Sequence, residues 1–501
     1  MFLTLGVFCV LKIFENESRI AFNDGFKKGM IEMNNKREKK SYLEAIGIII
    51  WVGTILSMFL VAHWAGTVAS HLMLSLIYLY LVNRSSDIEK ENITAVRMLI
   101  AIISSVLSLV WLFTRNYGLF IVIILIGCYI GIFEIIAYLT KKGQSWKKGG
   151  DILDRIIFVV WIFILITFSA LSIFLARITL SPHNFAYQFR NNVENATEAP
   201  ESKTVKLESG YYLTNDVQYS DRYANYFFDV YSDSDDFSVA KPVFIYIHGG
   251  YYVYGDKQYG DPNSKEKTGY YEMINSLIDK GFTVVTPNYA LTPEFSYPAP
   301  IHQMEDLAVF LKEHGAEYGI DANQIVYGGG GTGGQIAAQF VLTQTDKTYA
   351  DELHIDQVLT NGEIKAVYLG TALLNPAKVT DSDVFFVDFM LYQMARSYFD
   401  AGSMEKSPRA QQANIIEHVT ENFPATYITD GNYMSFASQA RDFVRKLEKL
   451  GVEHEYLNFN SDEYMGETIM QGYDVQNNEF ADLNRGKMVE FLSKQVIFVE
   501  K

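Results

Sequence analysis

Cysteine is almost absent from this chain of 501 residues. The two cysteines, Cys9 and Cys128, lie in apolar segments, and none occurs after residue 128. A disulfide framework and a cysteine-based metal site are therefore excluded for the C-terminal two-thirds of the chain. The sequence also shows no internal repeat and no low-complexity tract. We predict neither a metal site nor a cofactor.

Basic residues are scarce in the C-terminal part of the chain. Residues 1–178 hold 18 Lys and Arg against 12 Asp and Glu, whereas residues 179–501 hold 24 against 46. The resulting net charge of −22 argues against binding of nucleic acid and against docking onto anionic lipid headgroups. General solubility is the simplest explanation for so acidic a surface.

Long apolar runs are concentrated before residue 179. Five segments reach the roughly 17–25 residues that a membrane span requires, namely 43–64, 67–83, 95–113, 119–140 and 156–178. Residues 1–14 are a shorter apolar run without the basic start and cleavage site of a signal peptide. They are either an interfacial helix or a short span. The pattern predicts an N-terminal α-helical transmembrane bundle over residues 1–178, with five spans, or six if residues 1–14 also cross.

Basic residues in the short loops predict the orientation of these spans. Seven lie in residues 15–42, two in 84–94 and five in 141–155, and the loops between them hold at most one. This alternation places the basic loops in the cytoplasm and the chain after Arg177 outside. The predicted location is the cell membrane, multi-pass, with the C-terminal domain on the outer face of a bacterial cell.

Glu134 lies inside the fourth predicted span, where an ionised carboxylate is costly. One interpretation is an ion or proton site, or a polar contact with another membrane subunit. The other is a carboxyl that is held neutral or hydrogen-bonded within bundle packing. We prefer the second, which makes the N-terminal region an anchor or docking bundle rather than a transporter.

The rest of the chain predicts a linker followed by an α/β domain. Residues 179–210 are polar and irregular, whereas residues 211–501 alternate strand-like and helix-like stretches. The strand-like runs are 224–231, 243–247, 283–286, 324–327, 366–369, 425–429 and 454–459, and the helix-like ones are 271–280, 302–314, 335–342, 437–450 and 486–494. Such alternation indicates a mostly parallel sheet with helices on both faces.

Three motifs follow one another in this domain. They read His248-Gly249-Gly250-Tyr251-Tyr252-Val253-Tyr254-Gly255, then Asn288-Tyr289-Ala290-Leu291-Thr292-Pro293-Glu294, and then Gly328-Gly329-Gly330-Gly331-Thr332-Gly333-Gly334 between a strand and a helix. In this order and spacing, residues 211–501 resemble the esterase/lipase branch of the α/β-hydrolase superfamily, which includes hormone-sensitive-lipase-like enzymes. The resemblance implies the α/β-hydrolase fold.

The last motif also matches two nucleotide-binding patterns in part. A dinucleotide-binding G-x-G-x-x-G turn should follow the first strand of its domain, but this turn follows several strands. A P-loop needs a Lys after its glycines, and none is present.

The resemblance implies three catalytic positions, and none carries the residue that acyl transfer needs. The nucleophile of G-x-S-x-G corresponds to Gly331. Met434 stands at the position of the acid. Met465 stands at the position of the histidine. If the loop is one residue shorter, Tyr464 stands there instead. Because hydrolysis by this route requires a hydroxyl nucleophile, a base and a carboxylate, the sequence predicts a catalytically inactive pseudoenzyme.

The frame of the site is retained. Gly249, Gly250 and Thr332 keep the backbone N–H donors of an oxyanion hole, although inherited loop geometry explains the two glycines equally well. Aromatic and thioether side chains suited to an apolar ligand are expected around it, namely those of Tyr251, Tyr252, Tyr254, Met434 and Met465, together with His248.

These features predict a membrane-anchored binding, sensor or scaffold module at the cell surface. The expected partners are the lipid bilayer and a membrane protein or an apolar, acyl or cell-envelope ligand, with no nucleic acid. The alternative is an active surface carboxylesterase or deacetylase that uses non-standard groups such as Thr332, Asp430 or Glu463.

Overall fold

The computed structural model describes residues 173–190, 195–264, 268–360, 362–382 and 384–498, together with scattered positions between residues 103 and 170. The chain divides into two compact units, Met1–Leu180 and Ser181–Lys501. The second unit contains all the strands that the structure describes.

The predicted transmembrane bundle is contradicted. Within the described part of the chain, no helix is long and apolar enough to cross a membrane. Apart from residues 173–178 and scattered positions, the predicted spans lie outside the described residues, and so does Glu134. The predicted orientation and cell-surface location stay predictions.

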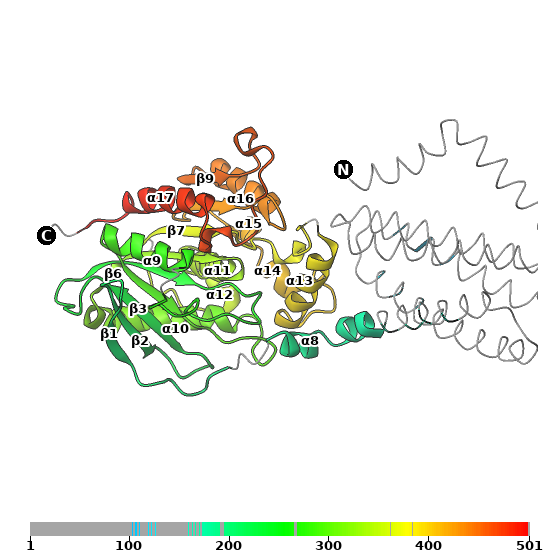
Figure 1. The fold of residues 1–501 in the computed structure, drawn as a ribbon, viewed down its shortest axis with the longest axis horizontal. Coiled ribbons are helices and arrows are strands. Elements are labelled where there is room, and N and C mark those ends of the chain that lie inside the picture. Colours follow the sequence, from blue (N-terminus) through cyan, green and yellow to red (C-terminus); the bar gives the residue numbers. More distant parts are fainter. Residues whose placement is uncertain are drawn as a thin grey trace, which may run out of the picture. The chain divides into compact units, whose positions relative to one another are not determined.

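A nine-stranded sheet forms the centre of the second unit (Figure 1). Its strands are β1 (Lys203–Lys206), β2 (Tyr212–Gln218), β3 (Phe227–Ser232), β4 (Lys241–Ile247), β5 (Thr283–Pro287), β6 (Ile320–Gly330), β7 (Ile364–Gly370), β8 (Ala425–Asp430) and β9 (His454–Asn458). They are arranged in the order β1-β2-β3-β5-β4-β6-β7-β8-β9. The pairs β1–β2, β2–β3 and β3–β5 are antiparallel, and all the other pairs are parallel. This is the arrangement of an α/β-hydrolase sheet.

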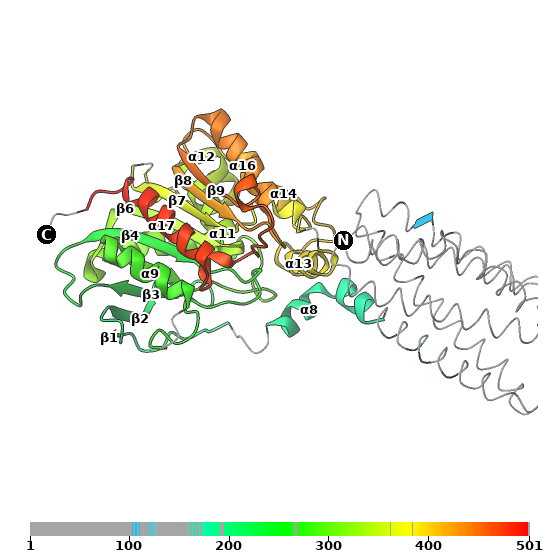
Figure 2. The same cartoon turned by 45° about the horizontal axis from the view of Figure 1, so that its top comes forward.

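Helices cover both faces of the sheet. The helices are α8 (Pro182–Phe189), α9 (Gly269–Lys280), α10 (Ala299–His314), α11 (Thr332–Thr345), α12 (Lys347–Leu353), α13 (Phe385–Tyr398), α14 (Pro408–Gln412), α15 (Ile415–His418), α16 (Ala437–Leu450) and α17 (Glu479–Ser493). The main core cluster joins α9 and α17 to one face, where Phe244, Tyr368 and Tyr427 are almost fully buried. Figure 2 shows these two helices side by side over the sheet. On the other face, Phe340 of α11 packs against Tyr327 of β6 with ring centroids 5.3 Å apart.

The seven predicted strand-like runs correspond to β3–β9. Central strands are buried on both faces of the sheet, as every residue of β5 is, and such strands read as uninterrupted apolar runs. Strand β1 and helix α8 lie within the predicted linker. The sequence Lys-Thr-Val-Lys of β1 is exposed at every position, so it carries no apolar pattern that predicts a strand.

The carboxyl end of β4 lies against the turn between β6 and α11. A Cβ atom at Gly333 would stand 2.1 Å from the carbonyl oxygen of Ile247 and 2.4 Å from that of His248. At Gly329 it would stand 2.6 Å from the same Ile247 oxygen. Both glycines are therefore required because two backbone segments meet here without room for a side chain.

We predict that Gly333→Ala destabilises the domain by about 1–3 kcal/mol, the usual cost of overpacking. Gly486→Ala is the matched control, because this α17 residue has open space around its Cβ position. That change should stabilise the helix by up to about 1 kcal/mol. Urea unfolding of the two variants measures both effects, and equal stabilities would contradict the steric argument.

Candidate active site

The turn between β6 and α11 has the geometry of a nucleophile elbow. Gly331 alone separates the last residue of β6 from the first of α11, with φ +56° and ψ −117°. Its N–H donates to Gly370 O at 2.9 Å, and its carbonyl accepts from Leu373 N at 3.1 Å. No atom lies within 4 Å of a Cβ placed at Gly331. Space for a nucleophilic side chain is therefore present, but the side chain is absent.

The glycine loop after β4 lies next to this elbow. A Cβ at Gly249 would stand 2.9 Å from Gly330 O. Gly250 adopts φ +119°, and its carbonyl accepts from Val253 N at 3.0 Å and Tyr254 N at 3.1 Å. Thr332 begins α11, so its backbone N–H has no acceptor within the helix. The three predicted oxyanion-hole residues thus come together in space. We call residues 248–255 the oxyanion loop.

A buried ion-pair network fixes the far end of this loop. Lys257 Nζ lies 2.9 Å from Asp216 Oδ1 of β2 and 3.1 Å from Asp229 Oδ1 of β3. The Lys257 and Asp229 side chains are 7% and 0% exposed. The backbone N–H of Lys257 also donates to Asn288 Oδ1 at 2.6 Å. Strands β2 and β3 thereby hold the chain segment that follows the oxyanion loop.

The four aromatic residues predicted to line a pocket separate into two groups. His248 stacks on Tyr289 with centroids 4.3 Å apart, and burial lowers its pKa. Tyr252 is 1% exposed and stacks on Tyr398 of α13 at 3.8 Å. These two are core residues. Tyr251 and Tyr254 are only partly buried, and burial raises the pKa of Tyr251 to about 12.

The two methionines at the other catalytic positions do not form a common pocket wall. Met434 is partly buried and adopts φ +52°. Met465 is 79% exposed, because it follows a short surface helix, Asp462–Tyr464. The predicted thioether lining therefore fails at Met465. The alternative residue Tyr464 packs its ring on Phe459, with centroids 4.8 Å apart.

Two carboxyl groups are buried at the carboxyl edge of the sheet. The sequence named Asp430 as a non-standard catalytic candidate but did not assign Asp474 to the site. Asp474 Oδ2 accepts from the Tyr368 hydroxyl at 2.8 Å. This oxygen lies 2.3 Å from the Cβ position of Gly370, whose carbonyl holds the elbow. Asp430, which ends β8, is 1% exposed. No motif predicts the burial of Asp474, since its partner Tyr368 lies 106 residues away.

Burial raises the pKa of both carboxyls. Burial raises the pKa of Asp474, and the hydrogen bond from Tyr368 opposes this rise. Burial also raises the pKa of Asp430; the Gly431 N–H opposes the rise, and Asp474 adds to it. A neutral carboxyl is poorly suited to orient a catalytic histidine, which needs an ionised acid.

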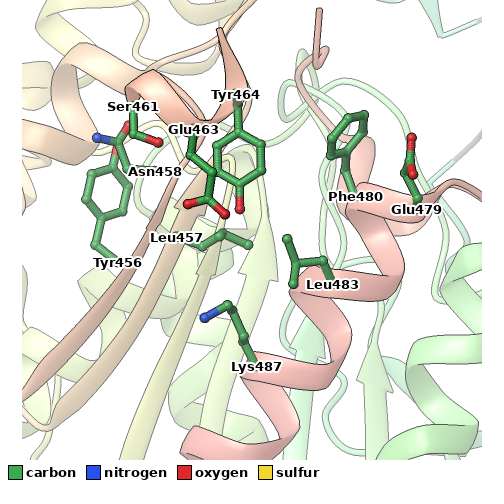
Figure 3. Close-up of a pocket in the computed structure, with 10 residues that line it drawn as sticks. All are labelled: Tyr456, Leu457, Asn458, Ser461, Glu463, Tyr464, Glu479, Phe480, Leu483 and Lys487. Atoms are coloured by element: carbon green, nitrogen blue, oxygen red, sulfur yellow. The ribbon is translucent and has the colours of Figure 1, made fainter. Parts of the chain in front are cut away.

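A groove of about 610 Å³ lies elsewhere, between β9 and α17. Its walls include Leu457 of β9, Glu463 and Tyr464 of the following loop, and Leu483 and Lys487 of α17. Figure 3 shows Glu463 and Tyr464 projecting from the loop toward the α17 side chains. No elbow or oxyanion-loop residue lines this groove, which makes Glu463 a poor candidate for chemistry at the elbow.

Known proteins resemble this domain. The BD-FAE family model matches residues 228–447. Esterase LipI of Mycobacterium tuberculosis is 34% identical over 232 residues, which cover 46% of this chain and 65% of that protein. Esterase LipQ of the same organism is 25% identical over 42% of this chain and 46% of its own length. The matched segments span less than two-thirds of each of these two relatives.

Solved structures also resemble the chain. Esterase B of Lactobacillus rhamnosis gives a TM-score of 0.45 at 16% identity and covers 64% of this chain and 95% of its own. Carboxyl esterase 2 of Tuber melanosporum gives a TM-score of 0.45 at 20% identity and covers 65% of this chain and 97% of its own. Strand order and elbow geometry give the described α/β part of the chain an α/β-hydrolase fold. The family match and the curated relatives make this part similar to esterases.

We predict that Lys257→Met destabilises the domain by about 3–5 kcal/mol, because it leaves Asp229 buried without its partner charge. A second change, Asp229→Asn, should recover part of this loss. Lys347→Met is the control: Lys347 pairs with Asp351 at 75% and 65% exposure, and losing such a pair costs less than about 1 kcal/mol. Chemical denaturation distinguishes these outcomes, and similar losses for both lysines would refute the role of burial.

We predict that Asp474→Asn becomes progressively more stabilising as pH rises above about 4. The unfolded chain releases the Asp474 proton near its ordinary pKa of 3.8, whereas the raised pKa retains it in the folded chain. Wild-type stability therefore falls as pH rises from 3.8 to the folded pKa, by about 1.4 kcal/mol per pH unit. The Asn variant lacks this loss and keeps an acceptor for Tyr368.

Urea titrations at pH 4 and pH 8 measure this effect. Asp351→Asn serves as the exposed control. A stability difference between wild type and Asp474→Asn that does not change with pH would show that Asp474 is not held protonated.

Proposed function

We propose that this α/β-hydrolase domain binds an acyl or other carbonyl-bearing ligand as a sensor or scaffold module and does not hydrolyse it by a Ser-His-Asp route. The observation that carries the proposal is the geometry at Gly331. The backbone adopts the elbow conformation, and open space remains at the Cβ position. The position is thus shaped for a nucleophile but has no side chain.

The neighbouring groups support binding. We assign the backbone N–H groups of Gly249, Gly250 and Thr332 as the donors to a ligand's carbonyl oxygen, because such donors stabilise partial negative charge without any reactive side chain. Met434 and Met465 supply neither an acid nor a base. Burial raises the pKa of Asp430 and of Asp474, which makes either carboxyl harder to ionise as the partner of a catalytic base.

An active carboxylesterase or deacetylase with a non-standard set of groups is the second candidate. The comparisons favour it, because the relatives named above are esterases. Thr332 adjoins the elbow, but its side chain is 2% exposed and faces Tyr289, whose pKa it lowers against the effect of burial. The residues at the elbow therefore favour the first candidate, and the names of the relatives favour the second.

We expect the full-length chain to show no saturable hydrolysis of p-nitrophenyl acetate or butyrate. Enzymes stripped of their triad retain only about 10³–10⁴-fold acceleration over water. Gly331→Ser should fold and remain inactive, since no base lies in place to activate the hydroxyl. Saturable turnover that Thr332→Ala abolishes would instead establish the second candidate.

Binding is tested separately with octanoate as the probe. We expect octanoate to raise the thermal transition of the wild type and of Gly331→Ser, because a ligand that binds only the folded state stabilises it. Gly331→Trp should remove this shift, since the indole fills the space at the elbow. Gly362→Trp, another glycine with open space around it, is the matched control. The binding proposal fails if octanoate shifts no variant, or shifts Gly331→Trp as much as the wild type.

A further inference from the structure

Helix α8 packs against the oxyanion loop. Ala186 of α8, Val253 of the loop and Met394 of α13 form one cluster in which each is at most 1% exposed. Phe189, the last residue of α8, lies 5.7 Å from Tyr254 between ring centroids. In both views α8 and α13 lie side by side at one end of the domain (Figures 1 and 2).

A polar contact fastens α8 to α13. His183 Nδ1 lies 3.0 Å from Ser397 Oγ, and His183 Nε2 lies 3.6 Å from Asp400 Oδ1. Serine, histidine and aspartate in this order suggest a catalytic triad. However, Ser397 is 0% exposed within α13, and its hydroxyl also contacts Thr292 Oγ1 at 3.3 Å. A hydroxyl enclosed in this way cannot reach a substrate, so the contact serves to join the two helices.

From α13 the connection continues to the oxyanion loop. Tyr398 follows Ser397 and stacks on Tyr252. The two ring centroids are 3.8 Å apart, and the angle between the ring planes is 5°. Helix α8 thus contacts the loop directly through Ala186 and Phe189, and indirectly through His183 and α13.

The loop needs this support because its backbone is strained. Tyr251 and Tyr252 adopt φ +54° and +64°, in the left-handed region that non-glycine residues rarely occupy. Such conformations persist only where the surrounding structure holds them. Helix α8 has only eight residues, too few to be stable in water without tertiary contacts. Helix α8 is therefore able to undock, and the conformation of the oxyanion loop depends on its contacts with α8.

We propose that α8 is a latch that holds the oxyanion loop in its binding conformation, so that undocking of α8 switches off the site. Because the second compact unit begins at Ser181, the polypeptide before it joins the site through α8, and a change in that segment acts on α8 first. The claim that undocking of α8 switches off the site rests on the proposed function. The claim that α8 holds the oxyanion loop in place does not depend on it.

Hydrogen exchange in the full-length chain tests the coupling without any ligand. The amides of Val253 and Tyr254 donate to Gly250 O, so their exchange reports the loop conformation. We expect His183→Ala to accelerate their exchange by about 2- to 10-fold, the equivalent of one hydrogen bond. His183→Asn should behave like wild type, because its side-chain amide replaces Nδ1 as the hydrogen-bond partner of Ser397 and can either donate or accept.

His314→Ala provides the matched control. The His314 side chain is 47% exposed beside Glu317, which matches the 48% exposure of His183 beside Asp400. However, His314 lies on α10 rather than on α8. This variant should leave the exchange of Val253 and Tyr254 unchanged. Equal exchange in His183→Ala and wild type would overturn the latch.

Ala186→Asp is the stronger perturbation, since it places a charge at a fully buried contact. Accelerated exchange confined to α8, α13 and the oxyanion loop supports the latch. Acceleration that extends to β6 and β8 would show that α8 belongs to the folding core, which also overturns it. Loss of octanoate binding in Ala186→Asp with fast loop exchange supports control of the site. If octanoate binding is lost while the exchange of the loop amides is unchanged, the proposed control of the site through the oxyanion loop is contradicted.

Discussion

The site depends on the close approach of the end of β4 to the turn that follows β6. Carbonyl oxygens of Ile247 and His248 occupy the places that side chains at Gly329 and Gly333 would need. The same approach places the oxyanion loop beside the start of α11. These glycines are therefore required by the fold whether or not a ligand binds. Their presence identifies the architecture but does not by itself indicate activity.

Gly331 differs from its neighbours in this respect. Nothing surrounds its Cβ position, so packing does not require a glycine there. The elbows of related hydrolases carry a serine in the same strained conformation. The glycine at 331 is therefore not a demand of packing, and the proposed binding function rests on this difference. At the same edge of the sheet, burial raises the pKa of Asp430 and Asp474.

The sequence predicts those features that depend on local pattern. Strands β3–β9 and the elbow were predictable because buried parallel strands give continuous apolar runs and because the Gly-rich turn has a fixed form. Tyr252 was assigned to the pocket, but it stacks on Tyr398, 146 positions later along the chain. Helix α8 was assigned to a linker because its contacts with the loop and α13 are visible only in three dimensions. The hydropathy-based membrane bundle was contradicted in the described part of the chain.

The esterase relatives and the vacant elbow are compatible with each other. Sequence identity of 34% over 232 residues involves far more positions than the three side chains that perform acyl transfer. Such identity establishes a common fold but is insensitive to the loss of these three residues. Function must therefore be decided from the site itself. There, close backbone contacts require the glycines at 329 and 333, whereas the open space at Gly331 would admit a side chain.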